Sequence, residues 1–191
     1  MSSVIQTVNE HEFEKTVGKR PFVALPQEEI DRLYGAIEVF PVHQNEVAVK
    51  SGGIPLCLFV VAHHNYTWMT CKKKGSNTLS LGFSGWLLSQ PNGDIFLDES
   101  IAAQAGSIFD AHVRSKGPYD VRIAGLMYDA STKFGSPRLG ITCICRLRQP
   151  DRVEPVKDDL EIGRMGNGEL LQKQNLFDDW SRIVIGNSVA L

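Results

Sequence analysis

The sequence predicts one sandwich domain of the α/β or α+β class, in which a mixed sheet packs between helices. Three observations lead to this fold class. The length of 191 residues suits a single domain. Segments with strand-like composition alternate with one helical pattern in the middle of the chain and another at its end. The composition is 42% hydrophobic and 22% charged, which is typical of a folded globular protein.

The first 35 residues are expected to be an extension with a short helix, and residues 36–191 the main domain. Pro26 can occupy the first turn of that helix, and Gly35 can end it. Strand-like composition follows at about 37–42, 46–50 and 55–63.

The next segment resembles a hairpin. His63-His64-Asn65 has the composition of its tip, and Tyr66 to Cys71 would be the return strand. A basic loop from Lys72 to Asn77 and a strand from Thr78 to Leu88 are expected to follow. Gln90-Pro91-Asn92-Gly93 is typical of a turn.

The pattern becomes helical from Asp98. Apolar residues recur at steps of three or four, and Gly117-Pro118 would stop the helix; the stripe comprises Ile101, Ala105, Ile108, Phe109 and Val113. Two long strands are expected at 119–128 and 138–147. An acidic stretch, 151–161, is compatible with an insertion, a lid or a linker, and it leads to closing helical segments at 169–174 and 176–185.

Composition excludes several classes of function. The formal net charge of −2 excludes a generally basic coat, so no extended nucleic acid is expected as a partner. The longest apolar run, 54–62, is shorter than the roughly 20 residues that a membrane span needs. The N-terminus has no signal-peptide pattern, and Cys57, Cys71, Cys143 and Cys145 do not form Cys-x2-Cys pairs. We therefore expect buried, reduced thiols and a cytoplasmic protein.

Several motifs resemble, in their order along the chain, those of the Nudix hydrolases. The signature of that family is Gly-x5-Glu-x7-Arg-Glu-U-x-Glu-Glu-x-Gly-U, where U is a bulky apolar residue, and Gly93 and Glu99 have the spacing of its first two members. Lys72–Gly75 and Ser80–Gly85 resemble the lysine-rich loop and glycine-rich strand of one Nudix subgroup. Gly135, Leu139-Gly140 and the segment from Trp180 to Ile183 resemble its later features. The resemblance runs from about residue 39 to 185 and implies a Nudix-like α/β/α sandwich.

The second half of the signature is changed in a way that affects its chemistry. Between Ser107 and Ser115 only Phe109 fits the pattern. The resemblance implies glutamates that bind Mg²⁺ or Mn²⁺ on one helix face, and the residues at those positions are Ile108, Ala111 and His112. Two of these are apolar, and a lone imidazole is a poor ligand for a hard cation. We therefore expect no metal cofactor.

The retained frame suggests a catalytically degenerate domain that binds a nucleotide or a nucleotide-derived small molecule. Lys72, Lys73 and Lys74 could attract phosphates, as could Arg138. Phe83 and Trp86 are three positions apart on a strand, so one should join the core while the other could stack on a base. The alternative for each of these residues is an ordinary place on the surface or in the core.

Two other functions stay open. A divergent active hydrolase of phosphoanhydrides would use Glu99 and Asp110 with Mg²⁺ or Mn²⁺, or His112 as an acid or base. Glu99 at a helix start and Asp110 on its surface could equally be capping and solvated residues. A scaffold for a protein partner, or a homodimer, is also compatible with the fold.

Overall fold

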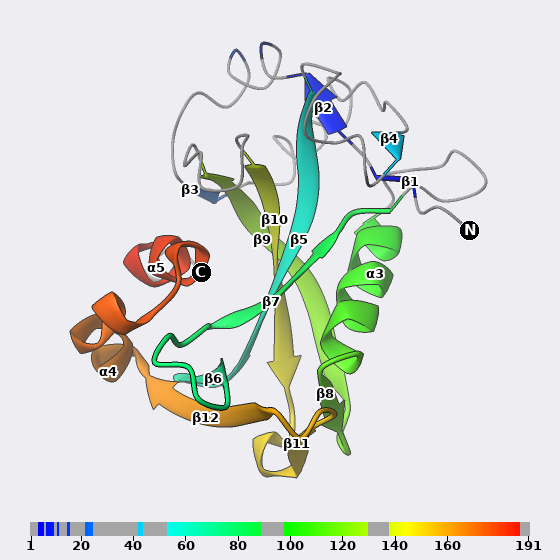
Figure 1. Cartoon of the computed structure of the whole chain (residues 1–191). Coiled ribbons are helices and arrows are strands. Elements are labelled where there is room, and N and C mark those ends of the chain that lie inside the picture. The colour runs from blue at the N-terminus through cyan, green and yellow to red at the C-terminus, as the bar shows by residue number, and fades with distance from the viewer. Residues whose placement is uncertain are drawn as a thin grey trace.

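The computed structural model describes residues 4–5, 7–9, 11, 15, 22–24, 42–43, 53–88, 98–129 and 138–187. Within them, one mixed sheet lies between a long helix on one face and two shorter helices on the other (Figure 1). This is the α/β/α sandwich that the sequence predicts. No helix in the described part of the chain is long and apolar enough to cross a membrane.

The sheet is ordered β12-β6-β5-β10-β9-β3, and β2 and β7 also pair with β5. β10 runs parallel to β5, whereas the other pairings in this sheet are antiparallel. Two smaller sheets pair β1 with β4 and β11 with β8. The strands are β1 (Val4–Ile5), β2 (Thr7–Asn9), β3 (Phe22–Ala24), β4 (Val42–His43), β5 (Gly53–His64), β6 (Thr67–Lys73), β7 (Gly82–Trp86), β8 (Val113–Ser115), β9 (Tyr119–Asp129), β10 (Arg138–Leu147), β11 (Val153–Pro155) and β12 (Leu160–Gly166).

β5 lies in the centre of the sheet, where both of its faces are buried, because its sequence is a continuous apolar run. Every residue from Ile54 to Ala62 is buried. A strand covered on both faces reads as a continuous apolar run rather than an alternating one. The two core clusters divide this run by alternation: Leu58 and Val60 pack toward α3 (Asp98–Asp110), and Phe59 and Val61 pack toward the C-terminal helices.

The hairpin after β5 turns one residue later than its sequence suggests. β5 continues through His64, and the turn is made by Asn65 and Tyr66, with Asn65 at φ 53°. Asparagine tolerates this left-handed conformation better than most residues. The return strand β6 extends to Lys73, so Lys72 and Lys73 belong to a strand rather than to the expected basic loop.

Helix α3 covers one face of the sheet with Ile101, Ala105 and Phe109, all fully buried. It ends at Asp110, before the expected stop at Gly117-Pro118. The chain leaves the helix because Val113 enters β8, which pairs with β11. Local periodicity could not show this pairing, because β11 lies about 40 residues further along.

The opposite face is covered by α4 (Asn167–Gln172), the 3-10 turn η3 (Gln174–Leu176) and α5 (Asp179–Gly186). Leu170, Phe177, Val184 and Ile185 bring their apolar side chains to the sheet. Asp178 caps α5 because its carboxylate accepts a 2.8 Å hydrogen bond from the Ser181 backbone N–H.

The acidic stretch 151–161 is part of the fold. It forms the 3-10 turn η2 (Pro150–Arg152), β11 and the start of β12, which pairs with β6. Two short segments of the expected N-terminal extension join the sheet as strands that the sequence does not predict, since β2 pairs with β5 and β3 with β9. The expected helix from Pro26, the strand at 46–50, most of the strand at 37–42 and the turn at 90–93 lie outside the described residues.

Candidate functional site

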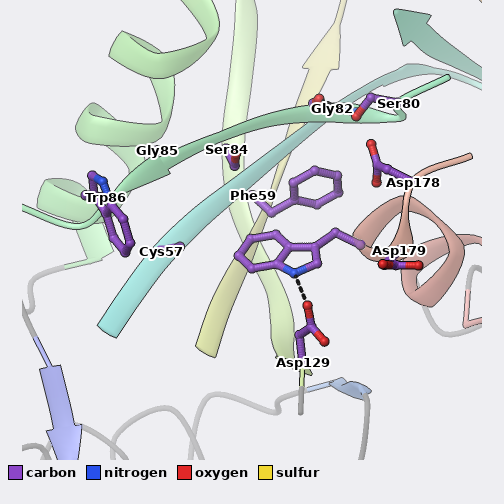
Figure 2. A pocket seen from close by; sticks show the side chains of 11 residues that line it. Cys57, Phe59, Ser80, Gly82, Ser84, Gly85, Trp86, Asp129, Asp178 and Asp179 are labelled. Carbon is purple, nitrogen blue, oxygen red and sulfur yellow. Dashed lines mark hydrogen bonds between the residues drawn. The ribbon is translucent and has the colours of Figure 1, made fainter. Parts of the chain in front are cut away.

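A cavity of about 450 Å³ opens between the sheet and the start of α5 (Figure 2). Aromatic side chains form much of its wall, and we call it the aromatic pocket. It is lined by Cys57, Phe59, Ser80, Gly82, Ser84, Gly85, Trp86, Asp129, Asp178, Asp179 and Trp180. Its volume falls within the range of about 300–1,000 Å³ that is usual for small-molecule sites.

The glycine-rich strand β7 forms one wall. Its Gly82 lies so close to β5 that a Cβ there would be 2.2 Å from the Val60 carbonyl oxygen. Only glycine permits this approach. Along β7, Phe83 turns into the core and Trp86 lines the aromatic pocket, which is the division of roles that alternation predicts.

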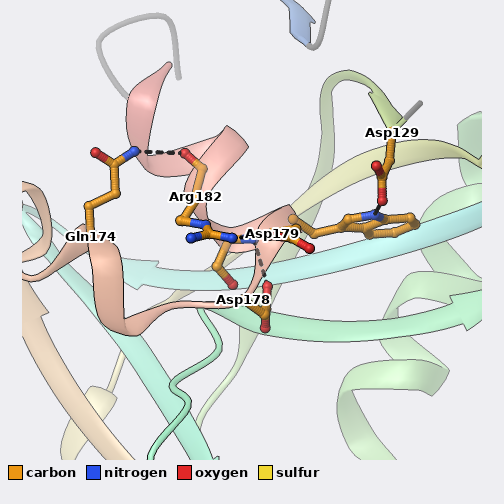
Figure 3. Close-up of polar contacts among 7 residues, drawn as sticks. Asp129, Gln174, Asp178, Asp179 and Arg182 are labelled. Carbon is orange, nitrogen blue, oxygen red and sulfur yellow. Dashed lines mark hydrogen bonds and ion pairs between the residues drawn. The ribbon is translucent and has the colours of Figure 1, made fainter. Parts of the chain in front are cut away.

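Trp180 forms the opposite wall and is held on two sides. Its ring meets Phe59 edge-on at a centroid distance of 5.6 Å. Its indole Nε1–H donates a 3.1 Å hydrogen bond to Oδ2 of Asp129, which is only 7% exposed (Figure 3). The helical spacing around Trp180 is the same for a core residue and for a pocket wall, so the sequence does not predict this role.

The aromatic pocket carries negative charge. Asp129, Asp178 and Asp179 contribute carboxylates, and no lysine or arginine is among its lining residues. Asp179 is ion-paired with Arg182, whose backbone carbonyl accepts a 3.1 Å hydrogen bond from Gln174 (Figure 3). This chemistry favours a group that donates hydrogen bonds or is cationic over a bare phosphate.

A second, shallower groove of about 330 Å³ adjoins the first, and we call it the lysine groove. The two share a ledge made of Ser80, Gly82, Ser84 and Asp178. The other lining residues are Cys71, Lys72, Lys73, Ser76, Thr78, Leu79, Phe83, His112 and Leu160. The aromatic pocket and the lysine groove therefore adjoin along β7 and the start of α5.

Two of the three candidate lysines reach this groove. Lys72 is ion-paired with Glu161 at 2.9 Å, and Lys73 approaches Asp159 at 3.8 Å. Such exposed pairs contribute only about 0–1 kcal/mol, so a ligand phosphate could replace either acid. Lys74 is exposed and is not part of the groove lining. Arg138 begins β10 opposite Asp129 in the backbone register.

Phe83 and His112 form the floor of the lysine groove. Their rings stack at a centroid distance of 4.4 Å, and Phe109 meets Phe83 edge-on at 6.5 Å. His112 Nδ1 lies 2.9 Å from the Ile108 carbonyl oxygen, which holds the imidazole at the helix end. Phe83 is only 6% exposed and belongs to the core, so its ring face is not open to a ligand, whereas Trp86 lines the aromatic pocket.

The acids proposed for an active hydrolase are not brought together. Glu99 is exposed in the first turn of α3, and Asp110 is its last residue. Eleven residues of α-helix separate them by about 16 Å. Asp110 accepts a 2.8 Å hydrogen bond from the Tyr119 hydroxyl. They cannot jointly hold one metal ion.

The positions that would hold Mg²⁺ do not fit that ion. Ile108 packs against the core, Ala111 has no donor atom, and the His112 ring is stacked on Phe83. Among the residues that the structure describes, no group of three or more His, Cys, Asp or Glu side chains could hold a metal. No hydrolytic step through a metal can be derived from these side chains.

Comparison with solved structures identifies similar folds. Tm1382, provisionally described as a Nudix hydrolase, aligns with a TM-score of 0.76 and 18% identity over 97% of this chain and 98% of its own. A NUDIX hydrolase from Nitrosomonas europaea aligns with a TM-score of 0.49 and 14% identity, over 71% of this chain and 88% of its own. A NUDIX-family hydrolase from Clostridium perfringens aligns with a TM-score of 0.43 and 8% identity, over 70% of this chain and 95% of its own.

No protein-family model matches the sequence, and a search of curated proteins found no match. The alignment with Tm1382 spans nearly all of both chains. Because the identity is only 18%, this alignment supports the fold and nothing further. Together with the sandwich of α3, the mixed sheet and α5, it shows that the chain has the Nudix-like fold that its motifs predict.

Proposed function

We propose that the chain binds a nucleotide or a nucleotide-derived small molecule across the aromatic pocket and the lysine groove, without metal-dependent hydrolysis. The observation that carries this proposal is the shared ledge of Ser80, Gly82, Ser84 and Asp178, which joins an aromatic cavity to a groove with two lysines. A nucleotide has the matching shape, because its base and its phosphates lie at opposite ends.

The base would occupy the aromatic pocket. Trp86 is half-buried there, and Trp180 is fixed by Asp129, so both present large rings at little cost in side-chain order. Stacking on an aromatic side chain contributes about 1–3 kcal/mol per base. The carboxylates of Asp178 and Asp179 would accept hydrogen bonds from the amino and imino groups of a base.

The phosphates would lie along the ledge toward Lys72 and Lys73. The acidic aromatic pocket repels them, and the lysine groove offers the ammonium groups. Lysine acts as a point charge and tolerates several phosphate positions. The lack of hydrolysis in this proposal follows from Ile108 and Ala111, which carry no metal-binding atoms.

Titration calorimetry with a nucleotide panel, in EDTA and again in Mg²⁺ or Mn²⁺, tests the proposal, with mass spectrometry to detect products. We expect submillimolar binding that EDTA does not change. Trp86→Ala should weaken it by roughly 5- to 150-fold, as the loss of about 1–3 kcal/mol of stacking implies. The Lys72→Ala, Lys73→Ala double variant should weaken the binding of nucleotides more than the binding of nucleosides, which lack phosphates.

Lys157→Ala is the matched control, because Lys157 is an exposed lysine outside both cavities. It should leave the affinity unchanged. Thermal unfolding of each variant establishes that the fold is retained. A metal-dependent product would contradict the proposal in favour of a hydrolase, and a panel without any binding would contradict it altogether.

A further inference from the structure

A third cavity lies at the other end of β5, away from the proposed nucleotide site. It is an open groove of about 310 Å³ lined by His63, Asn65, Tyr66, Arg122 and Arg146. We call it the arginine groove. No residue is common to this groove and the aromatic pocket or the lysine groove. Phe59 of the aromatic pocket and His63 are four residues apart on β5, a distance of about 13 Å along a strand.

Strand register brings the basic side chains of this groove together. Arg146 of β10 is paired with His63 of β5. Ile144, two residues before Arg146 on β10, is paired with Arg122 of β9. Directly opposite residues share a face, and so do residues two apart. Arg122, Arg146 and His63 therefore lie on one face of the sheet, just beyond the part that α4 and α5 cover.

The groove has positive charge without an acid in its lining. The nearest acid in the register is Asp120, which is paired with Arg146 across the strands. Its carboxylate accepts hydrogen bonds from Arg148 at 2.9 and 3.3 Å. Arg122 makes a further interaction within the chain, whereas no ion pair of Arg146 is found among the described residues.

His63 is held as a neutral wall of the groove. Its ring stacks on Trp68 at a centroid distance of 5.1 Å, and its Nδ1 lies 3.2 Å from the Asn65 carbonyl oxygen. Burial lowers the pKa of His63 below its ordinary value, and the charges of Arg122 and Arg146 lower it further. The positive charge at neutral pH therefore comes from the two guanidinium groups.

Guanidinium pairs suit one class of ligand in particular. The planar fork of arginine matches the oxygens of a phosphate and can donate two parallel hydrogen bonds. Tyr66 stands beside them at the hairpin turn and is 82% exposed, so its ring and hydroxyl are available to a ligand.

We propose that the arginine groove is a second binding site, which takes the phosphate group of a small molecule through Arg146 and Arg122. This site is independent of the proposed nucleotide site, and either could exist without the other.

The probe for this proposal is inorganic pyrophosphate, titrated into the protein in EDTA at low ionic strength and again at physiological salt. Because the lysine groove would also attract pyrophosphate, binding at the arginine groove is followed in the Lys72→Ala, Lys73→Ala background. We expect saturable binding that Arg146→Ala weakens at least tenfold, which corresponds to about 1.4 kcal/mol. Arg146→Lys should restore only part of the affinity, because lysine lacks the fork.

Arg152→Ala is the matched control, because Arg152 is an exposed arginine on η2 outside the groove. If Arg152→Ala and Arg146→Ala weakened pyrophosphate binding equally, the effect would be one of diffuse charge, and the proposal would be overturned. The absence of saturable binding would overturn it as well. Amide NMR shifts that cluster at residues 63–66 and 146 would support it, and unchanged thermal unfolding would show that the Arg146 variants are folded.

A second arm distinguishes the two sources of such a phosphate. ADP is compared with pyrophosphate in the Trp86→Ala protein, which weakens the aromatic pocket. Tighter binding of ADP that Tyr66→Ala abolishes would identify a nucleotide as the ligand class. Equal affinities, both sensitive to Arg146→Ala, would identify inorganic phosphates. Loss of ADP binding at the aromatic pocket leaves the pyrophosphate result unaffected.

Discussion

Gly85 of β7 lies directly against Ile108 of α3, so closely that a Cβ on the glycine would be 2.6 Å from the Ile108 Cδ1 atom. The resemblance to the Nudix signature implies a glutamate at position 108. Here an aliphatic side chain fills that position and fixes the helix to the glycine-rich strand. A packing contact therefore occupies the position where the resemblance implies a metal ligand.

This contact predicts that Gly85→Ala is destabilising. The added methyl group must displace the half-buried Ile108 side chain, and overpacking of this kind lowers the free energy of unfolding by up to about 1–3 kcal/mol. Urea unfolding would measure it. Gly168→Ala is the matched control, because nothing lies within 4 Å of a Cβ there, and alanine is the better helix former in α4.

The same contact predicts non-additivity between the two positions. Ile108→Ala alone should destabilise the fold because it removes buried atoms. In the Ile108→Ala protein, Gly85→Ala should lower the free energy of unfolding by less than in the native chain, since the added methyl group has space. Additive effects in the double-mutant cycle would show that the two residues do not press on each other.

Divalent cations provide a second prediction. Because Ile108, Ala111 and His112 do not form an oxygen-rich site, Mg²⁺ and Mn²⁺ should leave the midpoint of thermal unfolding unchanged. Differential scanning fluorimetry with increasing metal and with EDTA would test this. A saturable rise that Glu99→Gln or Asp110→Asn removes would reveal a rebuilt site and contradict it.

The hydrogen bond from Trp180 to Asp129 provides a third prediction. Asp129→Ala leaves the half-buried indole N–H without its acceptor, and an unsatisfied group of this kind costs about 1–3 kcal/mol. Asp129→Asn keeps an acceptor oxygen and should cost less. Urea unfolding measures stability, and near-ultraviolet circular dichroism reports whether the Trp180 ring stays ordered.

Trp180→Phe separates packing from hydrogen bonding in this pair. It keeps an aromatic ring beside Phe59 but removes the donor to Asp129. We expect Trp180→Phe and Asp129→Ala to lower nucleotide affinity by similar amounts, because both remove the hydrogen bond that holds the Trp180 wall of the aromatic pocket. Unchanged affinity in both variants would exclude Trp180 from the ligand site.

The sequence was sufficient for the elements that local pattern controls. The continuous apolar run 54–62 predicts the central strand, and the strands at 119–128 and 138–147 agree with β9 and β10 to within one residue. The helical pattern from Asp98 also predicts the start of α3. It does not predict the end of α3, because Val113 leaves the helical stripe to pair with β11, a contact between distant segments.

The site was less predictable than the fold for the same reason. Trp86 and the lysines stand out locally as an aromatic and a charged run. Asp129, Asp178 and Trp180 reach the aromatic pocket only because β9 and α5 meet in space. A capping aspartate and a helical tryptophan look alike in sequence whether they line a cavity or not. The arginine groove likewise depends on the register of β5, β9 and β10.

The free thiols provide a fourth prediction, on pH. Cys71, Cys143 and Cys145 are buried, and burial raises the pKa of the Cys71 and Cys145 thiols from 9.0 to about 12. It raises that of Cys143 as well. The unfolded chain releases these protons from about pH 9 upward, whereas the folded chain holds them. Their contribution to stability is therefore complete below pH 9 and is lost progressively as the pH rises toward 12.

Urea unfolding at several pH values between 8 and 11 tests this linkage, with the free energy of unfolding expected to fall above pH 9. Cys145→Ala is the informative variant, because it should have a smaller decline with pH even though its baseline stability is lower. The comparison of slopes removes the stability cost of the cavity and the contributions of all groups that both proteins share. A thiol reagent at neutral pH should label these cysteines only as fast as the chain unfolds. Rapid labelling of Cys145 in the native protein, or an identical slope in the variant, would contradict the burial of this thiol.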